Sequence, residues 1–165
     1  MQAHLSYGTL VAIEAVPITT PQTSQNIDFV TRVNRLLEEQ SPSAFRAAIP
    51  FEFKDLIVNL ILYSQHGDND FHLRVVGNRI GRLMAVESTG KTASQVFAAW
   101  PEFRDLFLHC AYKVTAQGCI SGLRGTLHYS ERSPEGFETI SVPVPDDASS
   151  KFLALCNVCV TGQST

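Results

Sequence analysis

The C-terminal third of the chain contains three strand-like segments separated by short turns, and their spacing restricts the fold more than any other sequence feature. The segments cover 119–129, 137–144 and 151–160. Between them, residues 133–136 (Ser-Pro-Glu-Gly) and 145–147 (Pro-Asp-Asp) are typical of turns. Neighbouring parallel strands need a crossover of about a dozen residues or more. The short links therefore predict antiparallel pairing.

Two more strand-like segments occur earlier in the chain. Residues 56–64 are rich in Ile, Leu and Val, and residues 71–77 begin with alternating apolar and polar residues. The polar stretch 66–70 between them predicts a hairpin. All five segments together predict an α+β domain with a five-stranded antiparallel sheet.

Helical patterns fill the stretch between the hairpin and the C-terminal strands. Asn78 is placed to cap a short helix through Met84, and residues 93–99 predict another turn or two. The longest helix begins at Pro101 and ends near Gly118. Its buried stripe is expected to contain Phe103, Leu106, Phe107, Cys110 and Val114.

Residues 1–49 are expected to form an extension before a domain that covers 50–162. Within the extension, residues 7–16 have the pattern of a short strand, and residues 24–40 predict an amphipathic helix. This helix either covers the core of its own chain or serves as a dimerisation helix, and the pattern fits both. Its apolar face is expected to contain Ile27, Val30, Val33 and Leu37, with Phe29 and Leu36 at the edge.

Composition excludes several classes of function. The 165 residues suit one domain, and 13 Lys and Arg against 16 Asp and Glu give a net charge of −3, which argues against nucleic acid. The longest apolar run, 56–63, is far shorter than the roughly 20 residues of a membrane span. No Lys or Arg precedes Arg32, so no secretory signal is recognised. We expect a cytoplasmic protein.

Several short motifs, in this order and spacing, resemble those of the PAS sensory fold. The closer likeness is to a group of small stand-alone PAS-like domains of proteobacteria, and it extends over about residues 50–160. The motifs are Phe-His-Leu-Arg-Val-Val-Gly-Asn-Arg-Ile at 71–80, Thr-Gly-Lys at 89–91, a long helix ending at Gly118, Gly125 in a strand, and Ile-Ser-Val-Pro-Val at 140–144.

The resemblance implies five antiparallel strands with helices on one face that enclose a pocket. Domains of this kind bind small molecules or dock onto partners, and they pass a signal to a separate regulator such as a two-component histidine kinase. They commonly form homodimers through a helix before the first strand, a place that residues 24–40 occupy. The implied function is a non-enzymatic sensory or regulatory module.

An apolar pocket is the expected ligand site. Such sites combine apolar walls with a few polar groups that orient the ligand, and Tyr129 and Asn157 are the candidates for that role. The alternative is a fully packed core with no cavity. No residue pattern identifies a cofactor or a ligand. The expected lining is Leu83, Met84, Phe107, Cys110, Leu127, Tyr129 and Asn157.

Residues 85–92 (Ala-Val-Glu-Ser-Thr-Gly-Lys-Thr) form a relaxed version of a phosphate-binding loop, which suggests a nucleotide-binding enzyme as an alternative. In that case Lys91 would hold phosphates and Thr92 would bind magnesium. The preceding segment is predicted to be a helix rather than a buried strand, so a glycine-containing turn is the simpler interpretation.

Two other patterns suggest metal chemistry, and the first gives a heme-binding sensor as a second alternative function. His109 lies on the long helix, where some heme-binding PAS domains carry their iron ligand, but it is about 120° from the centre of the buried stripe. We therefore expect a solvated histidine. Cys156 and Cys159 have C-x-x-C spacing on a predicted strand, where residues three apart point to opposite faces, so this pair is not expected to bind a metal.

Overall fold

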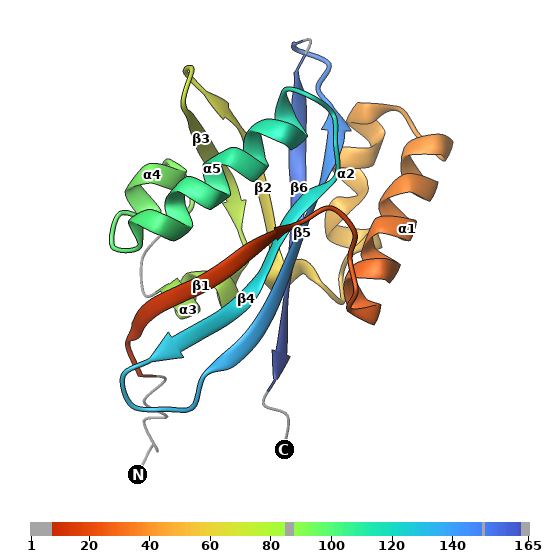
Figure 1. The fold of residues 1–165 in the computed structure, drawn as a ribbon. Coiled ribbons are helices and arrows are strands. Elements are labelled where there is room, and N and C mark those ends of the chain that lie inside the picture. Colours follow the sequence, from red (N-terminus) through yellow and green to blue (C-terminus); the bar gives the residue numbers. More distant parts are fainter. Residues whose placement is uncertain (1–7, 85–87, 150, 163–165) are drawn as a thin grey trace.

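The computed structural model describes residues 8–84, 88–149 and 151–162 (Figure 1). Helices and strands occur in separate groups along the chain, as is usual in α+β folds. The elements are β1 (Leu10–Ile18), α1 (Ser24–Glu39), α2 (Pro42–Glu52), the 3₁₀ turn η1 (Ile57–Asn59), β2 (Leu60–His66), β3 (Asp70–Val76), α3 (Asn78–Met84), α4 (Ala93–Val96), α5 (Pro101–Thr115), β4 (Ser121–Tyr129), β5 (Glu135–Pro145) and β6 (Phe152–Gly162).

In the described part of the chain, six strands form one antiparallel sheet in the order β1-β4-β5-β6-β2-β3. The α+β class and the antiparallel pairing are confirmed, but the expected number of five strands is wrong. The sixth strand is β1, which pairs with β4 at the edge of the sheet. Pro17 is tolerated within β1 because an edge strand has N–H positions that face away from the sheet.

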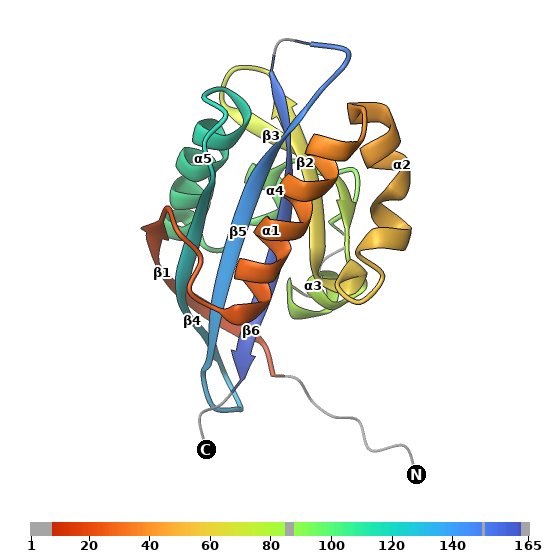
Figure 2. The same cartoon turned by 90° about the vertical axis from the view of Figure 1, so that its right-hand side faces the viewer.

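Helices cover both faces of the sheet, so the expectation of helices on one face is also wrong. Figure 1 shows α3, α4 and α5 on one side, and Figure 2 is turned so that α1 and α2 on the other side face the viewer. Because side chains alternate along a strand, β5 sends Phe137 into the α5 side and Ile140 into the α1 side. The two faces have separate hydrophobic cores.

The apolar face of α1 packs against its own sheet. Phe29, Val33 and Leu36 are buried there, whereas Ile27 is 49% exposed. The buried stripe is therefore rotated from the predicted one, because the residues expected at its edge form its centre. The core-covering interpretation of this helix is confirmed. Residues 10–49 belong to the same packed assembly as the rest of the described chain.

No helix or strand is predicted for the segment that forms α2. Pro42 occupies its first turn, where the missing N–H costs nothing, and the Ser41 hydroxyl accepts a hydrogen bond from the Ala44 N–H. Phe45 and Ile49 then bury against the sheet, so tertiary packing stabilises a helix that contains Pro50 in its last turn.

Glu138 on β5 fixes the start of α1 to the sheet. This carboxylate is fully buried and pairs with Arg124 on β4, with 2.7 Å between Arg124 Nη2 and Glu138 Oε2. The other oxygen, Oε1, accepts hydrogen bonds from the Thr23 hydroxyl at 2.8 Å and from Asn26 Nδ2 at 3.0 Å. The backbone N–H of Gln22 donates to Oε2 at 3.0 Å. One side chain thereby joins two strands to the residue that caps α1.

The same donors stabilise the charged form of Glu138. Burial on its own raises the pKa of this carboxyl, but the hydrogen bonds from Arg124 and the α1 segment outweigh it and lower the pKa to about 2. The stabilisation is complete above the ordinary value of 4.5 and is lost as the pH falls towards the folded-state value.

We predict that Glu138→Gln lowers the free energy of unfolding by about 3 kcal/mol at neutral pH, because it leaves Arg124 and the α1 donors without their charged acceptor. Urea denaturation between about pH 7 and pH 2 measures this. The difference from wild type should shrink as the pH falls below about 5, since the wild-type carboxyl then becomes protonated. Glu39→Gln, at an exposed position on α1, is the control. An unchanged acid dependence in Glu138→Gln would contradict the assignment.

Candidate functional site

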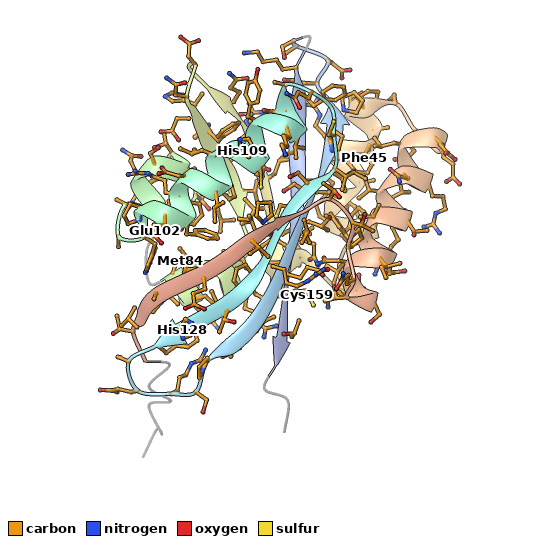
Figure 3. All side chains as sticks on the ribbon, viewed as in Figure 1. Phe45, Met84, Glu102, His109, His128 and Cys159 are labelled. Carbon is orange, nitrogen blue, oxygen red and sulfur yellow. The ribbon has the colours of Figure 1, made fainter. Side chains whose placement is uncertain are left out.

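An apolar cavity of about 60 Å³ lies between the sheet and helices α3 to α5. Four of the predicted pocket residues line it, and Figure 3 shows one of them, Met84, between the helices and the sheet. The structure brings these four together from α3, α5 and β4: Leu83, Met84, Phe107 and Leu127. Other residues that line the cavity were not predicted, among them Ile61, Ile80, Phe97, Phe103, Phe137 and Cys156.

Aromatic contacts give the cavity a defined wall. Phe103 and Phe107 are one turn apart on α5, and the ring of Phe97, just after α4, contacts both, with centroids 5.0 and 4.9 Å away. The rings of Phe103 and Phe107 are tilted rather than stacked on each other. Tyr63 extends the cluster from β2, with its ring centroid 5.4 Å from that of Phe107. These contacts hold the aromatic rings in place, so the rings determine the shape of the cavity.

The other three predicted pocket residues lie elsewhere. Cys110 is buried on α5, but its thiol points towards β4 and donates to the Gly122 carbonyl at 3.5 Å. Tyr129, at the end of β4, lines a second cleft instead. Asn157 faces α1, where its Nδ2 donates to Asn26 Oδ1 at 2.8 Å. Its neighbours Cys156 and Val158 point into the cavity, so strand alternation sends Asn157 to the opposite face, and its predicted role in the pocket is wrong.

The described residues that line the cavity are uncharged. Among them, Thr139 has a hydroxyl group, and Met84 and Cys156 carry sulfur. Burial raises the pKa of the Cys156 thiol to about 11, so at neutral pH it is protonated and not a nucleophile. The Tyr63 hydroxyl donates to Ser141 Oγ at 2.9 Å, and burial raises its pKa as well. The described lining therefore presents a mostly apolar surface without charge.

The size of the cavity limits what it holds. Small-molecule sites in proteins usually measure about 300–1,000 Å³, several times the volume found here. In this conformation the cavity accommodates a small apolar group, such as the end of a larger ligand, and not a flavin or a heme.

The glycine-containing segment before α4 is engaged within the chain. Residues 85–87 of the phosphate-loop motif lie outside the described residues. The N–H of Gly90 donates to the Leu73 carbonyl at 2.8 Å, and the N–H of Lys91 donates to the Ser88 carbonyl at 3.2 Å. The Thr92 hydroxyl caps α4 by accepting a hydrogen bond from the Gln95 N–H. The amides and the hydroxyl that would bind phosphate and magnesium thus have other partners, as expected for a turn before a helix.

The candidate metal ligands do not converge. His109 on α5 is exposed, as predicted (Figure 3). Cys156 faces the cavity, whereas Cys159 is three residues further along the strand and partly exposed. Within 8–84, 88–149 and 151–162, no three His, Cys, Asp or Glu side chains are grouped to hold a metal ion. No helix of this described part is long and apolar enough to cross a membrane.

Comparison with known proteins adds no assignment: no family model matches the sequence, and no curated protein or solved structure matches the chain. The function is therefore argued from the geometry of the chain itself.

We predict opposite effects for two matched substitutions on the same face of β4. Leu127→Phe adds volume next to the cavity and should leave the free energy of unfolding unchanged or slightly raised. Leu123→Phe adds the same volume where Leu123 is 1% exposed and does not line the cavity, so it should cost about 1–3 kcal/mol. Chemical denaturation measures both values. Equal destabilisation by the two substitutions would mean that no usable space exists beside Leu127.

Proposed function

We propose that this chain is a PAS-like sensory or regulatory module without enzymatic activity, which binds a small ligand through an apolar group and docks onto a separate signalling protein such as a histidine kinase. The observation that carries the proposal is the cavity under α3 to α5, lined by Leu83, Met84, Phe107 and Leu127. Its strand residues come from five contiguous antiparallel strands, β1-β4-β5-β6-β2. The resemblance implies a pocket between an antiparallel sheet and helices, and a cavity in this place supports that part of it.

The absence of charge among the described residues of the cavity lining supports binding rather than catalysis. Its thiol is protonated at neutral pH, and the aromatic wall of Phe97, Phe103 and Phe107 provides an apolar contact surface. A ligand controls such a module only through different affinities for two conformations. A ligand that needs more than about 60 Å³ must separate α3 or α5 from the sheet, and that displacement is what a partner would sense.

The buried face of α1 restricts how the module contacts partners. Phe29, Val33 and Leu36 are buried against the sheet of their own chain. A homodimer or a complex with a kinase would therefore use another surface. This differs from the dimerisation helix that the resemblance suggested for residues 24–40.

Native and denaturing mass spectra of freshly purified protein, with its visible absorption, test for a resident ligand. Benzene then tests the cavity, by the shift in thermal midpoint at saturating concentration. We predict that Leu127→Ala binds benzene more tightly than wild type, because it enlarges the cavity, and that Leu127→Phe binds none. A resident ligand whose mass is lost on denaturation, and which Leu127→Phe excludes, supports the proposal. No resident ligand, together with identical benzene responses in all three proteins, would overturn ligand binding at this cavity.

A further inference from the structure

A second cleft, of about 430 Å³, lies beside the cavity and shares Leu83 with it. Its walls come from segments far apart in the sequence: the turn η1, helix α3, the end of β4 and the β4–β5 hairpin. The volume falls within the usual range of small-molecule sites, roughly 300–1,000 Å³. Unlike the cavity, this cleft is lined by several charged side chains.

Three arginines and one acid line the cleft. Arg79 and Arg82 lie three residues apart on α3, so they share one face of that helix. Arg132 comes from the β4–β5 hairpin and pairs with Glu135, the one acid among the described residues that line the cleft. The lining therefore has an excess of positive charge, although the chain as a whole has a net charge of −3.

Tyr129 connects the two sides of the cleft. Its side chain is 9% exposed, and the guanidinium of Arg132 lies 3.8 Å from the centroid of its ring. Burial raises the pKa of Tyr129, while the charge of Arg79 acts on it from the helix side in the opposite direction. The ring is thus a buried aromatic surface with cations from two separate elements close to it.

The placement of Arg79 opposes local helix stability, whereas Arg82 lies in the last turn of α3, where a cation is favoured. Like charges three residues apart repel each other, and Arg79 lies in the first turn, where a cation is disfavoured. Neither arginine forms an ion pair with an acid in the described parts of the chain. Local conflicts of this kind are typical of binding sites.

We propose that this cleft binds a small organic anion whose carboxylate or phosphate group is held by Arg79 and Arg82, with its apolar part against Leu83 and Tyr129. Guanidinium groups suit both kinds of oxyanion, since they form paired, charge-assisted hydrogen bonds. The inference goes beyond the proposed function and does not depend on whether the apolar cavity holds a ligand. Because Leu83 lines both sites, an anion bound here would contact the helix that also closes the cavity.

Titration by calorimetry and by ¹⁵N NMR tests this with benzoate, phenyl phosphate and the neutral analogue benzyl alcohol. We expect saturable binding of at least one anion, no binding of benzyl alcohol at the same concentrations, and shifts of the Asn78, Leu83 and Tyr129 amides. The preferred anion identifies the head group as a carboxylate or a phosphate. Absence of saturable anion binding up to about 10 mM would overturn the proposal.

Variants distinguish specific binding in the cleft from a general attraction of the anion to positively charged side chains. Arg79→Ala and Arg82→Ala change exposed side chains, so the thermal midpoint should hold, while affinity for the preferred anion falls about tenfold or more in each. Arg82→Lys keeps the positive charge but loses the planar guanidinium group. Its affinity for the anion should therefore lie between those of Arg82→Ala and the wild type. The control is Arg35→Ala, an exposed arginine on α1. Equal loss in Arg35→Ala, or unchanged affinity in the Arg79→Ala/Arg82→Ala double variant, would overturn the assignment.

Discussion

A buried carboxylate on β5 connects the N-terminal segment of this protein to its sheet. Glu138 is fully buried, and its two oxygens receive the Arg124 guanidinium, the Thr23 hydroxyl and the Asn26 amide. An unpaired charge at this depth would be severely destabilising, so the partners and the carboxylate require one another. Thr23 also caps α1, which places the helix start over β5. The α1 side of the molecule is thereby fixed in register with the sheet, and Asn157 joins the same network from β6 through Asn26.

With α1 and α2 on one face, the other face is left to α3, α4 and α5, and both candidate sites lie on that side. The apolar cavity exists because the α5 phenylalanines and the strand residues do not fill the space between helix and sheet completely. The arginine cleft exists because α3 lies beside the β4–β5 hairpin, which brings Arg79 and Arg82 close to Arg132 and Tyr129. One site is apolar and the other is cationic, and Leu83 contributes to both. A ligand with an anionic head and an apolar end matches this combination.

The sequence predicted helices and strands well where the apolar residues followed a single period, either that of a helix or that of a strand. The three C-terminal strands and the long helix with Phe103, Phe107, Cys110 and Val114 buried lie close to where the sequence placed them. Four of the seven proposed pocket residues meet at one cavity for the same reason, since the apolar residues of α3, the α5 stripe and the β4 alternation all point there. Asn157 was assigned to the wrong face of β6. The arginine cleft was missed, although two arginines three residues apart on a short helix were a visible signal.

What the sequence by itself determined is five of the six strands of the sheet, their antiparallel direction, and which residues of each strand share a face. Short turns and alternation suffice for this, because both are local properties of the chain. Only the tertiary structure decided that β1 joins the sheet beside β4, that α1 and α2 cover the second face, and that α2 forms at all around Phe45 and Ile49. These outcomes depend on burial between residues distant in the sequence, as between Thr23 and Glu138, and no local pattern records such a contact.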